Sequence, residues 1–323
     1  MTQNDTSESP VNPASNAASF VAVIGAANVD ICAGSSAALA LGDSTPGTIT
    51  TAAGGVARNV AENLSRLAHR VRLISAVGDD AHGQFVLDHT RQAGVDVATC
   101  STWPGRRTGS YLSLSHPDGS LVAAINDMAI LELLSPIQLQ RHAAVLASAS
   151  ALVVDCNLSV ESIAWLVQHS GNKPIFVDGV SSHKCLKILP HLARVHTLKV
   201  NRLEAAALTG LPVENAEQAL AAAQSLRMHR VENVVVSLGG GGVCWSGPGN
   251  SQGHVGAFKV NAINSNGAGD ALMAGLVHGA LAGWTLDASA RFGNACAALT
   301  MTCTSANHPH LSVASVSRLM SAN

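Results

Sequence analysis

Residues 266–270, Asn-Gly-Ala-Gly-Asp, have the residue types and spacing most suited to chemistry in this chain. They lead into an apolar segment with leucines at helical spacing, which predicts a glycine turn that opens a helix. The first N–H groups of a helix lack a partner within it and the helix dipole is positive there, so an anion can bind. Asp270 would lie beside this anion, where a base is useful. The alternative is a glycine-rich loop capped by an aspartate, because short motifs often occur without a function.

The elements expected around this stretch indicate an α/β fold. Short apolar runs predict strands at residues 20–24, 72–77, 151–156, 174–178, 197–199, 233–237 and 243–245. Helical patterns predict helices at about 56–67, 82–93, 136–147, 160–168, 183–189, 202–209, 215–228, 269–282, 286–302 and 312–320. Because the strands alternate with helices, we expect a doubly wound, mainly parallel sheet flanked by helices.

Two segments interrupt this alternation and predict a small sheet outside the main body. Residues 31–53 contain turn signals and a Thr-Ile-Thr-Thr run, which predict weak strands. Residues from about 98 to 125 predict a hairpin with a Pro-Asp-Gly turn. Polar and apolar side chains alternate along its first arm, at residues 110–115. We expect both segments to belong to one domain of residues 20–323. The polar residues 1–19 predict a disordered tail.

The composition excludes several classes of function. Of the 323 residues 12% are charged and 3% are aromatic, and the net charge is −2, so nucleic acid is not an expected partner. No uninterrupted apolar run is long enough to span a membrane. The seven cysteines form no CxxC pair, and the N-terminal residues lack the basic and apolar regions of a signal peptide. We therefore expect a reduced, cytoplasmic protein.

Polar and glycine-rich segments follow several predicted strands, which is where ligands bind in α/β sheets. Asp30, two residues after Asn28, is either a ligand for the hydroxyls of a polyol or a turn aspartate. Gly54 and Gly55 precede a helix and permit a close approach of a ligand to the backbone. The four glycines 239–242 lack the GK[ST] ending of a Walker A loop, so they form either a nucleotide loop or a flexible turn.

Five motifs occur in an order that resembles the ribokinase-like (PfkB) family of carbohydrate and nucleoside kinases. They are the Asn-x-Asp at 28–30, GGVARN, Asn201-x-x-Glu204, the glycine run after Ser237, and the GAGD that ends at Asp270. The resemblance covers about residues 20–320 and implies a ribokinase-like fold with a small β-sheet lid. Within the family the chain is similar to the pseudouridine kinases. The stretches that carry this similarity are GGVARNVAENLSRL, LISAVGDD, SYLSL, AINDMAIL, VVDCNLS, FVDGVSSHK, HTLKVNRLEA and GAGDALMAGL.

The resemblance implies a role for individual residues. Asp270 is implied as the base that accepts the proton of the sugar 5′-hydroxyl, and Gly267, Ala268 and Gly269 as the anion hole for the transferred phosphoryl group. The residues implied for ribose binding are Asn28, Asp30, Gly54, Gly55 and Asn59. Those implied for ATP are Asn201 and Glu204 near the triphosphate and Mg²⁺, Ser237, Gly239 and Gly242 beside the nucleotide, and Asn294 near the adenine.

Three further polar residues are candidates for contacts with the nucleoside: Asn126, Asn157 and Lys184. Asn126 follows the predicted hairpin and Asn157 follows a core strand, so both are interpreted as substrate-binding. The alternative for each of the three is an ordinary polar residue of a loop or the surface.

The chain departs from the family pattern at four positions. Asn266 replaces the usual threonine before GAGD, which changes the shape of the group beside the phosphate. Asn264 replaces an aspartate of a monovalent-cation site, so only weak activation by potassium is expected, through its carbonyl. Gly179 and Val200 replace prolines of the pseudouridine kinases, and we expect them to loosen the backbone without removing chemistry.

The chemistry implied is transfer of a phosphoryl group from ATP, with Mg²⁺, to the 5′-hydroxyl of pseudouridine. Such transfer needs positioning and electrostatic stabilisation more than covalent help. The alternatives are a kinase for another ribonucleoside or a free sugar, and a catalytically silent nucleoside-binding regulator. A dinucleotide oxidoreductase fits poorly, because no GxGxxG follows the first strand. The family's lid often pairs subunits, which implies a homodimer.

Overall fold

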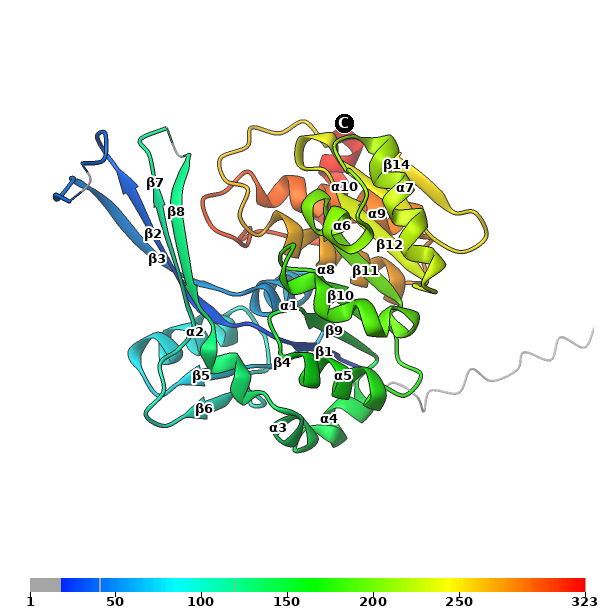
Figure 1. The fold of residues 1–323 in the computed structure, drawn as a ribbon, viewed down its shortest axis with the longest axis horizontal. Coiled ribbons are helices and arrows are strands. Elements are labelled where there is room, and N and C mark those ends of the chain that lie inside the picture. Colours follow the sequence, from blue (N-terminus) through cyan, green and yellow to red (C-terminus); the bar gives the residue numbers. More distant parts are fainter. Residues whose placement is uncertain (1–18, 41, 119, 323) are drawn as a thin grey trace, which may run out of the picture.

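The computed structural model describes residues 19–40, 42–118 and 120–322. The tail predicted for residues 1–19 lies outside the described residues, apart from Ser19. The described chain forms a body in which helices flank a central sheet, and a smaller sheet projects from this body (Figure 1). The predicted α/β class is therefore confirmed.

The central sheet has eight strands in the order β14-β13-β12-β11-β10-β9-β1-β4. Their bounds are β1 Val21–Ile24, β4 Val71–Ile74, β9 Ala151–Asp155, β10 Ile175–Asp178, β11 Thr197–Asn201, β12 Asn233–Ser237, β13 Val243–Ser246 and β14 Gln252–Val255. Neighbouring strands from β12 to β4 are parallel, and β13 and β14 are added antiparallel at one edge. The prediction of a mainly parallel sheet is confirmed, although it did not include β14.

Helices cover both faces of the central sheet. Its strands are therefore continuous apolar runs in which polar and apolar residues do not alternate. Along β1, Val21 and Val23 join one core while Ala22 and Ile24 join the other. The first core is closed by α1 Val56–Arg66, α8 Ala268–Leu281, α9 Leu286–Thr300 and α10 Val313–Ala322, with α2 Ala81–Gln92 alongside. The second is closed by α3 Pro136–Gln140, α4 Ala143–Ser148, α5 Val160–His169, α6 Arg202–Thr209, α7 Ala216–Met228 and the 3₁₀ helix η3 Lys184–Arg194.

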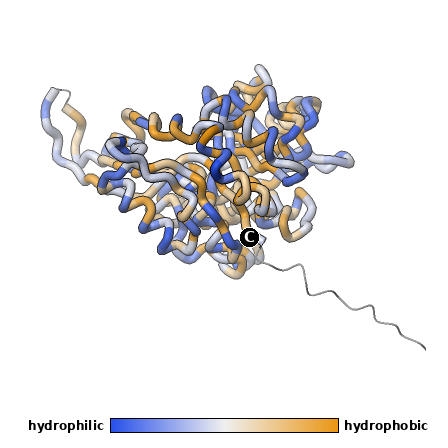
Figure 2. The backbone as a smooth tube through the Cα atoms, turned by 90° about the horizontal axis from the view of Figure 1, so that it is seen from below, coloured by the Kyte–Doolittle hydropathy of each residue, from blue (hydrophilic) through white to orange (hydrophobic). Residues whose placement is uncertain are grey.

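The smaller sheet is the predicted lid, and it extends away from the body in two perpendicular views (Figures 1 and 2). Its strand order is β3-β2-β7-β8, with bounds β2 Asn28–Ser35, β3 Gly47–Gly54, β7 Ser110–Ser115 and β8 Leu121–Asp127. Strands β2 and β3 are eight residues each, longer than the weak strands expected for residues 31–53. Because β2 already begins at Asn28, Asp30 lies on a lid strand and not at the end of a strand of the central sheet.

Several predicted elements are divided in the structure. The strand expected at 72–77 is split at Ser75 into β4 and β5 Ala76–Gly78, and β5 pairs with β6 Ser101–Trp103 in a separate two-stranded sheet. Residues 98–109 therefore contribute no strand to the lid. The helix expected at 136–147 is interrupted at Arg141 and His142, whose N–H groups bond three residues back and tighten the turn. The helix expected at 183–189 is the longer 3₁₀ helix η3, in which Pro190 has no N–H for an α-helical bond.

Candidate functional site

Charged side chains lie at the carboxyl ends of three neighbouring strands. Asp155 ends β9, Asp178 ends β10, and Lys199 lies two residues before the end of β11. All three are buried. Asp155 accepts hydrogen bonds from the N–H groups of Ala26, at 2.8 Å, and Ala57, at 3.0 Å. These bonds bring the turn after β1 and the start of α1 to this edge of the sheet.

The predicted glycine turn does open a helix at the same edge. Gly267 precedes α8 with φ of 75°, and a Cβ there would lie 1.8 Å from the carbonyl oxygen of Ala306. A Cβ on Gly269 would lie 2.8 Å from Lys199 Nζ. Gly267 therefore needs to be glycine, and the start of α8 lies directly against a buried ammonium group. The N–H groups of the first turn, the helix dipole and Lys199 offer positive charge at the start of α8, where a phosphoryl group could bind.

Asp270 lies in the first turn of α8 and is buried. Asn59 Nδ2, from α1, donates a hydrogen bond to its Oδ2 at 2.8 Å. Burial raises the pKa of Asp270 above its ordinary value of 3.8, and the charge of Asp178 adds to this, while Lys199 and Asn59 oppose it. A carboxylate with a raised pKa that keeps a donor on one oxygen can accept a proton on the other.

Lys199 was not singled out by the sequence, although it is a lone lysine in an apolar strand. Its Nζ pairs with Asp178 Oδ2 at 2.9 Å. Burial lowers the pKa of Lys199, but the charges of Asp178, Glu204 and Asp270 outweigh burial and raise it to about 12. The side chain is therefore a fixed positive charge below the start of α8.

The residues implied for ribose binding lie where the lid strands meet the start of α1, and one of them contacts Asp270. Asn28 Nδ2 donates to Asp30 Oδ1 at 2.7 Å. A Cβ on Gly54 would lie 2.2 Å from Asp30 Oδ2, and Gly55, with φ of 101°, would place a Cβ 2.4 Å from the Ala26 carbonyl oxygen. The two glycines thus let β3 and the start of α1 lie close to Asp30 and to the turn after β1. Asn59 lies one helical turn after Gly55, and its amide binds Asp270.

Tyr111, the single tyrosine of the chain, was missed as a site residue by the sequence interpretation. Register places Asp30 opposite Tyr111, and Tyr111 opposite Asn126, so the three side chains share one face of the lid. The alternation in residues 110–115 was the available signal, because it places Tyr111 and Leu112 on opposite faces.

A cavity of about 440 Å³ lies between the end of the lid and the loops after β9 and β10, and it is lined by Asn126, Asn157 and Lys184 among others. The three nucleoside candidates therefore come together. Lys184 Nζ donates to Asn157 Oδ1 at 2.7 Å, which fixes the orientation of the amide. The amide nitrogen of Asn157 and the ammonium group are donors, and Asp127 and Glu132 in the same lining are acceptors.

Asn201 and Glu204, implied for the triphosphate and Mg²⁺, form a capping box at the start of α6. Asn201 Oδ1 accepts from the N–H groups of residues 203 and 204, and Glu204 Oε2 accepts from the Asn201 N–H at 2.9 Å. Because both Glu204 oxygens are engaged by Asn201, the pair fits an indirect contact with a metal through water. A Cβ on Gly179 would lie 2.7 Å from Glu204 Oε2, so glycine here makes room for the carboxylate.

The residues implied for the rest of the nucleotide converge at the antiparallel edge of the sheet. Gly239 begins the 3₁₀ helix η4 Gly239–Gly241, directly after β12. Gly242 has φ of 86°, and a Cβ there would lie 2.0 Å from the Val255 carbonyl oxygen. Asn294 Nδ2 donates to the Gly256 carbonyl at 2.9 Å. Ser237 Oγ reaches the Val200 carbonyl at 3.4 Å. Their contact with ATP stays a prediction.

Asn264 and Asn266 form a closed turn before α8. Asn264 Oδ1 accepts from the Asn266 N–H at 2.9 Å, and Asn264 Nδ2 donates to the Thr304 carbonyl at 2.9 Å. A carboxylate at position 264 could not make the second bond, because it has no donor.

In the described part of the chain, no group of three or more His, Cys, Asp or Glu residues is placed to hold a metal ion.

The model of the pfkB family of carbohydrate kinases matches residues 18–312. The chain belongs to this family. It is 40% identical over 301 residues to the pseudouridine kinase of Escherichia coli strain K12, which covers 93% of this chain and 96% of that one. It is 37% identical over 293 residues to the uncharacterized sugar kinase YeiI of the same strain, covering 91% and 81%. A ribokinase structure from Thermotoga maritima has a TM-score of 0.81 at 19% identity, covering 94% and 99%, and shows the ribokinase-like fold.

Membership of this family establishes the class of reaction that the protein catalyses. A pfkB-family kinase is a phosphotransferase with an alcohol acceptor, and the acceptor of this one is a small sugar or nucleoside. Among the described helices, none is both long and apolar enough to cross a bilayer.

Replacing Asp270 by Asn should lower turnover by about 10²- to 10⁴-fold, because positioned acid–base groups contribute that much. The free energy of unfolding should not fall when Asp270 is replaced by Asn. The folded pKa of Asp270 lies above its unfolded value, so wild-type stability decreases as pH rises through the interval between the two. Kinetics and thermal unfolding at pH 8 measure both quantities. Wild-type-like turnover in the variant would remove Asp270 from the mechanism.

Potassium should activate the enzyme only weakly, because both side-chain groups of Asn264 are already hydrogen-bonded and neither is a carboxylate. Initial rates in sodium, potassium and tetramethylammonium chloride at equal ionic strength should differ little, because the site offers no charged ligand for the cation. Asn264→Asp is the matched variant and should gain potassium dependence. Strong, saturable activation of the wild type by potassium would contradict the prediction.

Proposed function

We propose that this kinase transfers the γ-phosphoryl group of MgATP to the 5′-hydroxyl of pseudouridine, giving pseudouridine 5′-phosphate. The observation that carries the proposal is the 40% identity to a pseudouridine kinase over 93% of the chain. The polar cavity beside the lid supports a nucleoside acceptor, because it offers both donors and acceptors beyond the ribose group.

In the proposed mechanism Asp270 orients the 5′-hydroxyl and accepts its proton as the phosphoryl group leaves ATP. Asn28, Asp30 and Asn59 hold the ribose. The first N–H groups of α8, at Gly267, Ala268 and Gly269, meet the negative charge on the transferred group, and Lys199 lies close enough to add to that effect. The lid carries Asp30 and Tyr111, so its closure over the ribose would also exclude water from the phosphoryl group.

On the nucleotide side, Asn201, Ser237, Gly239, Gly242 and Asn294 would border ATP. Mg²⁺, when bound with ATP, neutralises charge on the phosphate oxygens. Glu204 would act on it through water, because both of its oxygens already accept hydrogen bonds. The buried cysteines, free in the structure, fit the reducing environment of the cytoplasm.

A kinase for a free sugar or another ribonucleoside is the second candidate. The similarity to the sugar kinase YeiI, at 37% identity, favours it. A silent nucleoside-binding regulator is disfavoured by the buried carboxylate of Asp270 and its bond to Asn59.

We also propose a homodimer formed through the lid. The lid face opposite Asp30 exposes apolar side chains, among them Ile49, Leu112 and Ile125, which are 72%, 45% and 70% exposed. Apolar residues gathered on one face of an exposed sheet are typical of an interface. A second lid of the same chain would cover them with side chains of matching character.

Pseudouridine should be preferred to uridine by about 5- to 150-fold in kcat/KM, the range for leaving one buried polar group unpaired. Pseudouridine has an additional ring N–H that an acceptor in the cavity can bind. Initial rates with pseudouridine, uridine, adenosine and ribose at saturating MgATP decide between the candidates. Equal kcat/KM for the two nucleosides, or a clear preference for free ribose, would favour the second candidate.

A further inference from the structure

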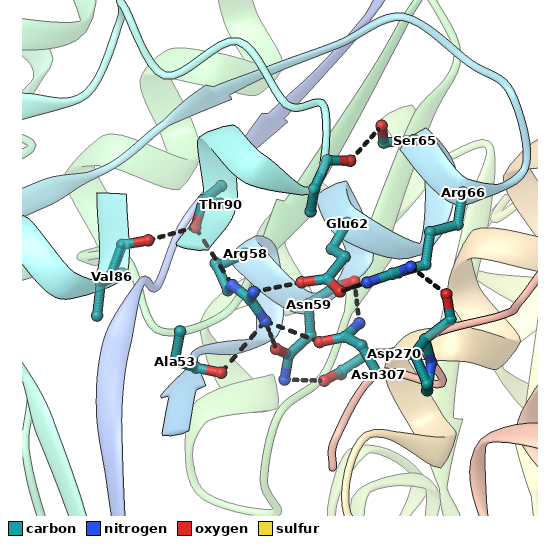
Figure 3. Close-up of polar contacts among 12 residues, drawn as sticks. Ala53, Arg58, Asn59, Glu62, Ser65, Arg66, Val86, Thr90, Asp270 and Asn307 are labelled. Carbon is teal, nitrogen blue, oxygen red and sulfur yellow. Dashed lines mark hydrogen bonds and ion pairs between the residues drawn. The ribbon is translucent and has the colours of Figure 1, made fainter. Parts of the chain in front are cut away.

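A network of buried polar side chains leads from α1 to Asp270 (Figure 3). At its centre is Arg58, in the first turn of α1, which is 4% exposed. Arg58 Nη1 donates to Asn59 Oδ1 at 3.0 Å and to Asn307 Oδ1 at 2.8 Å. Its Nε donates to Thr90 Oγ1 at 3.2 Å, and its Nη2 pairs with Glu62 one turn along the helix.

Both oxygens of Asn59, in the side chain and in the backbone, therefore accept hydrogen bonds from this network. Arg58 binds its side-chain oxygen, and Asn307 Nδ2 donates to its backbone carbonyl at 2.9 Å. Its remaining group, Nδ2, donates to Asp270 Oδ2 at 2.8 Å. These contacts connect Glu62 to Asp270: Arg58 donates to Glu62 and to Asn59, and Asn59 donates to Asp270.

Stability alone is a weak explanation for this network. Replacing a buried ion pair by apolar side chains of similar volume is often neutral or stabilising. What the pair does supply is a fixed orientation of the Asn59 amide. If the amide were reversed, its NH₂ group would face the guanidinium donors and its oxygen would face the Asp270 carboxylate. Arg58 excludes this arrangement.

We propose that Arg58 is a positioning residue that fixes the Asn59 amide and thereby holds the Asp270 carboxyl in its orientation toward the acceptor hydroxyl. The proposal rests on the proposed role of Asp270 as base. Asn307 assists from the segment after α9, and Thr304 of the same segment is bonded to Asn264. Arg58 itself touches no reacting atom, because Asn59 lies between it and Asp270.

The protonation of Asp270 also depends on the other groups that face it. Asp178 from β10 and Asp155 from β9 favour the protonated form, and burial acts in the same direction. Lys199 from β11 and the Asn59 amide favour the ionised form. When the amide is free to turn away, one of the two opposing contributions is lost. The pKa of Asp270 then rises further, and less of the enzyme carries the base at neutral pH.

The test compares Arg58→Gln with Arg66→Gln. Arg66 lies two turns later on the same helix, carries the same charge and pairs with the same Glu62, but no bond joins it to Asn59. Turnover is measured from pH 5.5 to 9.5 at saturating nucleoside and MgATP, with thermal unfolding of each variant. Arg58→Gln should move the acidic limb of kcat upward by about one pH unit, equivalent to a tenfold loss on that limb. Arg66→Gln should leave the profile unchanged.

Asn307→Ala gives a second variant that retains the Arg58–Glu62 pair, and it should move the limb in the same direction by a smaller amount. A wild-type pH profile in folded Arg58→Gln overturns the proposal, as does an equal shift in Arg66→Gln. If Arg58→Gln does not fold, an unshifted limb in Asn307→Ala overturns it. Asp270→Asn with wild-type turnover would instead contradict the proposed base, which separates the two failures.

Discussion

The carboxylate of Asp155 is the contact on which the arrangement of the site depends. It accepts hydrogen bonds from Ala26 after β1 and from Ala57 at the start of α1, so three segments distant in sequence meet at the end of β9. Gly25 is required for this approach, because a Cβ there would lie 2.3 Å from Asp155 Oδ2. Through the position of α1, the same contact places Asn59 against Asp270. The segments that we propose to bind the sugar and the phosphoryl group are thus joined by one buried carboxylate.

An excess of buried negative charge follows from this arrangement. Asp155, Asp178 and Asp270 share the edge with one ammonium group, that of Lys199, whose Nζ pairs with Asp178. Burial and the neighbouring carboxylates raise the pKa of Asp270, which brings the carboxyl closer to the pKa useful for a base at neutral pH. The same lysine lies against the start of α8, where it also offers positive charge to a phosphoryl group. One buried cation therefore serves both the base and the anion site in the proposed mechanism.

Local periodicity in the sequence predicted the central sheet and the helix after Gly267, while the grouping of Asn28, Asp30 and Asn59 was implied by the resemblance to the family. The sequence did not predict what depends on register between distant strands. Asp30 lies on a lid strand beside Tyr111 because β2 pairs with β7, some 80 residues away. Lys199 and Arg58 were missed as site residues for a related reason, since a buried charge acquires its role only from partners on other elements.

The central claim is that Asp270 is a buried carboxyl held by Asn59 and ready to accept a proton. Titration of the aspartate carboxyl carbons by ¹³C NMR, with the Asp270→Asn variant assigning the signal, tests it most directly. The account predicts that the missing signal titrates well above the ordinary value of 3.8, and that its pKa rises further in Asn59→Ala. A signal that titrates at the ordinary aspartate value, unchanged by loss of Asn59, would contradict the account.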